Sequence, residues 1–226
     1  MKTSQALNKT LRLFLIFTLA VSLTISFPAT KGLAYAPTYG SYHYKFVVDE
    51  DGFTWVTIDY ESFETSGSSW VFVPKFSNWS NRTLSGRILQ SEVVETEQVV
   101  GAEHYFYKAF TFSFKSDKSF RMSIQFNMTA GALIIEPRGV FLSPQIGFQE
   151  DNTGTAEVFL PKDSKVVKAN YPPTKETANY VLFDLYENLI RLQIEFKTGI
   201  TTPELSTLEQ GIFTFQTVKR YESYAS

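Results

Sequence analysis

The sequence predicts an all-β protein built as an antiparallel β-sandwich, either one large sandwich or two packed subdomains. Apolar residues recur with a period of two, rather than 3.6, through most of the chain after residue 40. Runs rich in Tyr, Phe, Val, Ile and Thr alternate with turn residues. The chain of 226 residues also contains 21 Phe and 12 Tyr, which supply a large β core.

The first 36 residues have the layout of a secretory signal peptide. Basic residues ending at Arg12 precede an uncharged apolar run over 13–27, and Ala34 and Ala36 supply the small side chains that a signal peptidase needs. We predict cleavage after Ala36, which leaves a β-sandwich domain of residues 37–226 outside the cytoplasm. Without cleavage the run would anchor the chain, since it approaches the ~20 residues that a bilayer requires.

The composition disfavours several classes of function. Charged residues make up 19% of the chain and the formal net charge is −2, so no broad basic surface for nucleic acid is expected. Cysteine is absent, so an exported chain must be stabilised by packing and sheet hydrogen bonds, without disulfides or thiolate metal sites. The sequence implies no cofactor.

Two β-hairpins are expected in the first half of the domain. The runs 42–48 and 53–60 flank an acidic turn in which Gly52 can adopt a positive φ. The runs 105–114 and 120–126 are joined by a polar connection of hairpin length.

Shorter strands are expected at 132–135, 139–142 and 155–161, with prolines marking their ends. The runs 180–186 and 189–196 predict a third hairpin.

One short helix is expected near the C-terminus. Thr202 can cap it, and Leu205, Leu208 and Ile212 share one face. The polar stretch 149–154 is a candidate boundary between subdomains.

Exposed aromatic residues in an exported β-sandwich are typical of carbohydrate binding, because Trp and Tyr rings stack on sugar faces. Trp70 and Trp79 are therefore the candidate ligand-binding residues, whereas Trp55 is expected to face the core. Three Asn-x-Ser/Thr sequons, at Asn78, Asn81 and Asn127, are candidate glycosylation sites. The first two are expected to share an exposed polar loop.

Catalytic motifs are missing from the sequence. There is no nucleophile elbow, phosphate loop, dinucleotide fingerprint or His-Glu-x-x-His zinc motif. A glycosidase needs only two carboxylates roughly 5 to 9.5 Å apart. The candidates for such a pair are Glu136, Asp184, Glu187 and Glu195.

Metal binding is not expected at the histidines or the acidic turns. His43 and His104 could form a joint site only if their strands were neighbours, so they are interpreted as packing residues. The clusters 49–51 and 150–152 offer oxygen ligands for calcium, but solvated turns are favoured for both.

The stretch 42–60 resembles the opening of N-terminal β domains of exported archaeal surface proteins, some of which precede a peptidase-MA-like metallopeptidase module. The strand that ends at Pro161, the late hairpin and the tail 213–221 are similar in order. The resemblance implies an accessory domain of a larger exported protein. The zinc-binding helix of that peptidase family is absent, so no catalytic residue can be carried over.

These observations predict an exported, non-catalytic module for binding or structural support at the cell surface, with a surface glycan or protein as its partner. One alternative is a carbohydrate-binding module or a jelly-roll glycosidase. Another is an assembly subunit whose exposed edge strand accepts a strand from a neighbour.

Overall fold

The computed structural model describes residues 39–149 and 152–199, so the signal segment and the expected C-terminal helix lie outside the described residues. The described chain is almost entirely β, which confirms the predicted fold class. Its elements are β1 (Ser41–Val48), β2 (Thr54–Ser62), β3 (Ser66–Pro74), β4 (Trp79–Ser85), β5 (Arg87–Glu95), α2 (Glu97–Val100), β6 (Tyr107–Lys115), β7 (Phe120–Met128), β8 (Ala132–Ile135), β9 (Arg138–Leu142), β10 (Thr153–Phe159), β11 (Lys165–Ala169), β12 (Lys175–Glu176), β13 (Tyr180–Leu185) and β14 (Gln193–Lys197).

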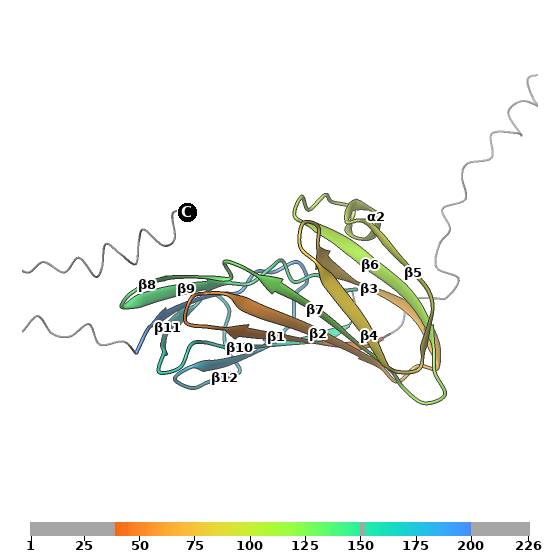
Figure 1. Ribbon diagram of the computed structural model, residues 1–226. Helices are drawn as coiled ribbons and strands as arrows, with labels where there is room; N and C mark the ends of the chain where they lie inside the picture. Colours follow the sequence, from red (N-terminus) through yellow and green to blue (C-terminus); the bar gives the residue numbers. More distant parts are fainter. Residues whose placement is uncertain (1–38, 150–151, 200–226) are drawn as a thin grey trace, which may run out of the picture. The chain divides into compact units, whose positions relative to one another are not determined.

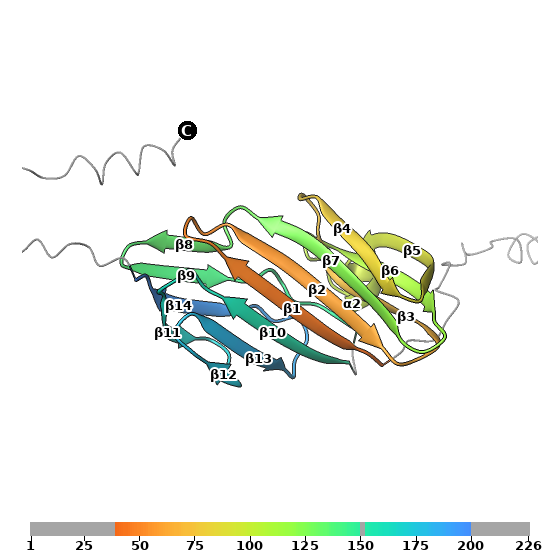
Figure 2. The same ribbon diagram turned by 60° about the horizontal axis from the view of Figure 1, so that its bottom comes forward.

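The strands form three sheets. A seven-stranded sheet (Figure 1) has the order β12-β13-β10-β1-β2-β7-β4, which can be followed in Figure 2. A four-stranded sheet has the order β11-β14-β9-β8, and a three-stranded sheet the order β3-β6-β5. The strand pairs are antiparallel except for β1 and β10, which run parallel at the centre of the large sheet. Residues on both sides of 149–154 therefore belong to the same sheet.

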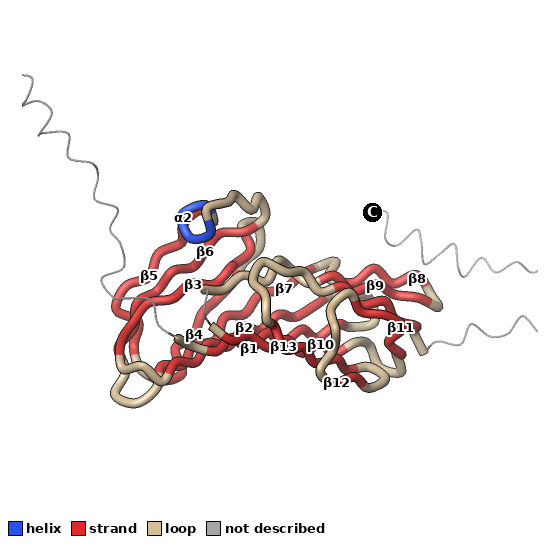
Figure 3. The backbone as a smooth tube through the Cα atoms, turned by 180° about the vertical axis from the view of Figure 1, so that it is seen from behind, coloured by secondary structure: helices blue, strands red, loops and turns tan. Residues whose placement is uncertain are grey.

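The two smaller sheets cover opposite ends of one face of the seven-stranded sheet (Figure 3). Near one end, the ring of Tyr60 in β2 lies 5.3 Å from that of Phe112 in β6. Near the other end, Phe46 in β1 lies 5.5 Å from Phe141 in β9. The molecule is therefore a two-layer sandwich whose second layer is divided.

The segment 143–148 joins the two parts of the second layer. The amide of Phe72 in β3 donates to the carbonyl of Gly147 at 3.2 Å, and the amide of Ile146 donates to the carbonyl of Ile190 at 2.9 Å. One stretch of backbone is thus bonded to the three-stranded sheet and to the loop that precedes β14.

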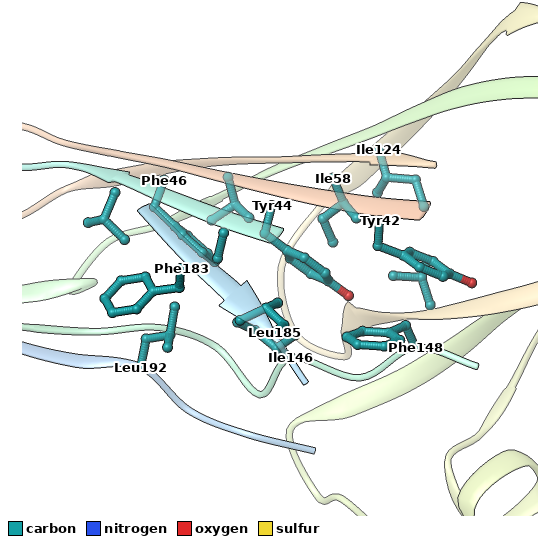
Figure 4. Packing of buried hydrophobic residues seen from close by; sticks show 14 of the residues in the cluster. Tyr42, Tyr44, Phe46, Ile58, Ile124, Ile146, Phe148, Phe183, Leu185 and Leu192 are labelled. Carbon is teal, nitrogen blue, oxygen red and sulfur yellow. The ribbon is translucent and has the colours of Figure 1, made fainter. Parts of the chain in front are cut away.

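Two buried tyrosines of β1 cross the sandwich to this second layer. Figure 4 shows Tyr42 and Tyr44 extending toward the layer that holds Ile146 and Phe148. The Tyr44 hydroxyl donates to the carbonyl of Gly147 at 3.1 Å, and the Tyr42 hydroxyl donates to the carbonyl of Trp70 at 2.9 Å. Burial raises the pKa of both phenols well above the ordinary value of 10.0. Both side chains are therefore neutral throughout the physiological pH range.

The first expected hairpin is confirmed. β1 and β2 pair in antiparallel register from Ser41 with Glu61 to Val48 with Thr54. Gly52 in their turn has φ +83°, and a Cβ there would lie 2.1 Å from the carbonyl oxygen of Ala132. Glycine is required at this position for both reasons.

The second and third expected hairpins are wrong. β6 and β7 lie in different sheets, and so do β13 and β14. Phe114 and Phe120, which flank the polar connection between β6 and β7, stack with ring centroids 4.3 Å apart. Their inward faces meet across the core, so the connection carries the chain from one layer to the other.

The prediction that Trp55 faces the core is also wrong. Its side chain is 46% exposed and packs against Phe53 on the outer face of the large sheet. Its neighbours along β2, Thr54 and Val56, point inward and are buried.

Candidate functional site

Three large aromatic side chains gather on two loops at one end of the three-stranded sheet. Phe76, Tyr105 and Phe106 are 66%, 63% and 59% exposed. The ring of Tyr105 lies 5.8 Å from that of Phe76 and 5.1 Å from that of Phe106. We call these three residues the aromatic tip. An exposed apolar cluster of this kind is a candidate interaction surface.

Backbone hydrogen bonds bring the two loops of the tip together. The amide of Lys75, just after β3, donates to the carbonyl of Phe106 at 2.9 Å. The amide of Tyr107 donates to the carbonyl of His104 at 2.9 Å and closes a turn. Tyr105 and Phe106 occupy the corners of this turn, so their side chains point outward beside Phe76.

A buried hydroxyl fixes the longer loop. Thr96 is 1% exposed, and its Oγ1 donates to the carbonyl of Ala102 at 3.0 Å while it accepts from the amide of His104 at 2.8 Å. The helix α2 lies inside this loop (Figure 1) and is capped after Val100 by Gly101, whose φ of 69° is left-handed. The backbone that carries Tyr105 is therefore preordered.

The charges around the tip are largely paired. The Nζ of Lys75 lies 5.7 Å from the ring centre of Tyr105 and 3.7 Å from a carboxylate oxygen of Glu95. The other oxygen of Glu95 lies 2.9 Å from the Nζ of Lys108. The hydrogen bond from Lys108 holds the pKa of Glu95 below its ordinary value.

The charged groups of this region are Glu95, Glu97, Glu103, Lys75 and Lys108. Three carboxylates against two ammonium groups leave a surplus of one negative charge.

The rings of the tip do not form a flat platform. Phe76 is inclined by 46° to Tyr105 and by 75° to Phe106, and Tyr105 is inclined by 88° to Phe106. The edges and faces of the three rings therefore point in several different directions. This arrangement suits insertion into an apolar pocket better than stacking on the flat face of a sugar.

Trp70 and Trp79 lie on opposite sides of the three-stranded sheet. Trp70 is paired with Thr111 of β6, so the two side chains share a face. Trp79 packs on Phe110 with ring centroids 5.1 Å apart, and Phe110 points to the opposite face from Thr111. The structure does not bring the two tryptophans together.

The sequence pattern does not reveal the tip, because the run 105–114 predicts a strand that includes Tyr105 and Phe106. The signal that could have found it is the unbroken aromatic series from His104 to Tyr107. In a half-buried strand every second residue of such a series would face the core.

The three sequon asparagines are exposed. Asn78 lies in the loop before β4, and Asn127 stands on β7 opposite Trp55. The expectation of one shared polar loop is wrong for Asn81, which stands on the edge strand β4, paired with Ile124 of β7.

The candidate glycosidase carboxylates are dispersed. Asp184 lies on the outer face of the seven-stranded sheet, where it accepts a hydrogen bond from the Thr174 hydroxyl at 2.9 Å. Glu195 lies on the outer face of the four-stranded sheet, on the opposite side of the sandwich. Glu136 is in the turn between β8 and β9, and Glu187 is in the loop after β13.

The two histidines lie in or next to different sheets. His43 stands on β1 with its Nε2 3.0 Å from a carboxylate oxygen of Glu157. His104 precedes β6, and its ring lies 5.2 Å from that of Phe72. Across 39–149 and 152–199, no three His, Asp or Glu side chains are grouped as a metal site would require.

The first acidic turn uses its carboxylate locally. Oδ1 of Asp49 accepts from the amides of Asp51 at 3.0 Å and Phe53 at 2.9 Å. In the second cluster, Glu150 and Asp151 lie outside the described residues, while Oδ1 of Asn152 accepts from the amide of Gly40.

No protein-family model matches the chain, and no curated protein matches it. Among solved structures, it is similar to an aminopeptidase N family protein from Idiomarina loihiensis, with 12% identity and a TM-score of 0.41 over 69% of this chain and 29% of that one. An M1 zinc metallopeptidase from Deinococcus radiodurans shows 14% identity and a TM-score of 0.31 over 71% and 42%. The folded domain of Mycobacterium tuberculosis LppM shows 7% identity and a TM-score of 0.34 over 74% and 95%.

The chain thus spans less than half the length of the two peptidases. Within the described part of the chain, no helix is long and apolar enough to cross a bilayer.

Proposed function

We propose that this chain is an exported, non-catalytic module that binds a protein partner at the cell surface through the aromatic tip. The observation that carries the proposal is the cluster of Phe76, Tyr105 and Phe106, three exposed rings in mutual contact on preordered loops. Rigid aromatic side chains dominate the energetic centres of protein interfaces. Preordering by Thr96 reduces the entropy lost on binding.

The charges of the tip favour a protein over an anionic membrane. Binding to anionic lipid needs clustered basic residues. Here Lys75 and Lys108 both lie within 4 Å of Glu95, and the region has one surplus negative charge. The mutual tilt of the rings also disfavours a sugar-stacking platform.

Dispersed polar groups support a non-catalytic role. Asp184 and Glu195 lie on opposite outer surfaces of the sandwich, and His43 and His104 lie in or next to different sheets. As an accessory domain of a larger exported protein, the module would supply adhesion to a partner.

The test is a peptide selection on immobilised residues 37–226, using a phage-displayed random peptide library. Selected peptides are then measured against the double variant Phe76→Ala with Phe106→Ala. Its matched control is Phe63→Ala, which removes a ring that is 81% exposed but lies outside the tip. We expect the tip variant to weaken peptide binding at least about ten-fold, or roughly 1.4 kcal/mol, and the control to leave it unchanged.

The same proteins are tested against neutral and anionic phospholipid vesicles and on a glycan array. Tip-dependent binding to vesicles or glycans without tip-dependent peptides would refute the protein-binding proposal. Peptides that bind both variants equally would refute it as well.

A second candidate function is glycan binding at Trp70. This ring is partly exposed on the outer face of the three-stranded sheet, in one row with Thr111 and Glu92, and the exposed Glu92 side chain supplies a carboxylate on that face. On a glycan array, Trp70→Ala should abolish such binding. Trp79→Ala should act through stability, because its ring packs on buried Phe110.

A further inference from the structure

The outer face of the four-stranded sheet carries an apolar patch. It consists of Leu133, Ile135, Val140 and Leu142, whose side chains are 66%, 53%, 36% and 43% exposed, respectively. Leu133 of β8 and Val140 of β9 are direct cross-strand neighbours. The inward residues of the same strands, such as Phe141, are buried in the core. The patch is therefore an exposed apolar surface in addition to the buried core. One of its two strands, β8, is an edge strand.

The other half of this face is cationic. In register, Ile135 is followed across the sheet by Arg138, Lys197 and Lys165, and Val140 is followed by Glu195 and Lys168. Four cations therefore surround a single carboxylate beside the patch. A partner that suits this face has an apolar stripe flanked by acidic groups.

The chain itself leaves the sheet at this place. Lys197 at the end of β14 is paired with Arg138, which is paired with Ile135 of the patch. The described chain ends two residues later, at Gly199. The three residues to Thr202 can span about 10 Å, enough to reach the rim of the face.

The sequence that follows has the required pattern. Leu205, Leu208 and Ile212 have the i, i+3, i+7 spacing that places side chains on one helix face. Glu204 and Glu209 flank this stripe on its two sides. A helix over 202–212 would be about 16 Å long. Four strands spaced by about 4.8 Å span about 14 Å, so a helix of this length fits on the face.

We infer that residues 202–212 of this chain dock as an amphipathic helix on the outer face of the four-stranded sheet. Leu205, Leu208 and Ile212 cover the apolar patch, and the glutamate on the cationic side of the stripe faces the cations of β9, β11 and β14. The sandwich then has a third layer at this end. This inference is independent of the aromatic tip.

The absence of cysteine allows a direct test by engineered cross-linking in residues 37–226. The test variant combines Val140→Cys on the patch with Leu208→Cys in the docking segment. The matched control combines Leu208→Cys with Leu89→Cys, which is 39% exposed on β5 of the other small sheet. Under mild oxidation we expect the test pair to form an intrachain disulfide at least about ten-fold faster than the control, at a rate independent of protein concentration.

The cysteine-free chain provides a second measurement. We expect slowed amide hydrogen exchange over 202–212, and its loss in Glu204→Lys with Glu209→Lys, because the helix would then be repelled by the cations. Equal cross-linking of test and control pairs would overturn the inference. Cross-links that form chiefly between chains, and increase with concentration, would also overturn it, because the occupant would then be a second copy.

Discussion

The two ends of the seven-stranded sheet are covered by different packing chemistry. Under the three-stranded sheet, Phe112, Phe114 and Phe120 pack on one another, with ring centroids 4.3 to 6.4 Å apart. Under the four-stranded sheet, the buried side chains mix rings with aliphatic residues such as Ile194 and Leu192. The first end is packed largely by ring-to-ring contacts, whereas the second combines rings such as Phe141 with aliphatic side chains.

The largest expected effect tests this difference directly. Phe114→Ala should lower the free energy of unfolding by about 3 to 5 kcal/mol, because it leaves a cavity beside Phe120. The matched truncation at the mixed end, Ile194→Ala, should cost less, about 2 to 3 kcal/mol, because smaller neighbouring side chains can partly close the space that it leaves. Urea unfolding followed by circular dichroism measures both. Equal losses at the two ends would break the comparison.

The aromatic end also depends on one buried hydroxyl. Thr96→Val should lower the free energy of unfolding by about 1 to 3 kcal/mol, because the amide of His104 and the carbonyl of Ala102 lose their partner. Hydrogen exchange should accelerate over 101–106. Thr111→Val is the control, since its hydroxyl donates to Glu92 within the sheet. If that control accelerated exchange in the tip loop equally, Thr96 would have no special role.

The junction between the two ends should be sensitive to alkaline pH. The folded-state pKa values of Tyr42 and Tyr44 are raised, so the unfolded chain loses these protons first, near pH 10. The stabilisation is therefore complete below pH 10 and declines above it, by about 1.4 kcal/mol per pH unit for each phenol.

Tyr44→Phe should reduce the alkaline decline in the free energy of unfolding by about half. It should also lower that free energy by about 1 kcal/mol at pH 8, because the variant lacks the hydrogen bond to the Gly147 carbonyl. Tyr186→Phe is the control, because that side chain is 83% exposed. Unfolding midpoints measured between pH 8 and pH 12 distinguish the variants. An unchanged slope in Tyr44→Phe would show that this phenol does not resist ionisation.

The smallest expected effect lies outside both covered ends. Trp55→Ala should cost about 1 kcal/mol or less, because the ring is 46% exposed and contacts Phe53 on the outer face. Thermal unfolding checks this value. A loss as large as that of Phe114→Ala would place the ring in the core after all.

The sequence was sufficient to predict the fold class and much of the core, because period-two alternation identifies the inward residues of a strand whichever strand lies beside it. Tyr42, Tyr44 and Phe46 follow this pattern and are buried. Pairing was harder to predict. A short polar connection such as 116–119 fits a hairpin and a crossing between layers equally well, and only the stacking of Phe114 on Phe120 distinguishes them.

The candidate site was harder still. Tyr105 and Phe106 leave the strand because His104 is held by Thr96, eight positions earlier. No local pattern reveals a hydrogen bond between a side chain and a distant backbone amide. Trp70 and Trp79 were conspicuous by residue type alone, but their positions on opposite sides of one sheet depend on pairing that the sequence did not show.

The parallel pairing of β1 with β10 has a consequence for how the protein is made. His43 and Thr155, which face each other across this pair, are 112 positions apart in the chain. Contacts of such high sequence separation slow folding, because a large loop must close before the contact can form. β1, the first of the described strands to be synthesised, therefore has one open edge until β10 has followed. We expect truncated chains that end before Thr153 to be unable to complete the central sheet, and the unfinished chain to be exposed to proteases and aggregation for most of its synthesis.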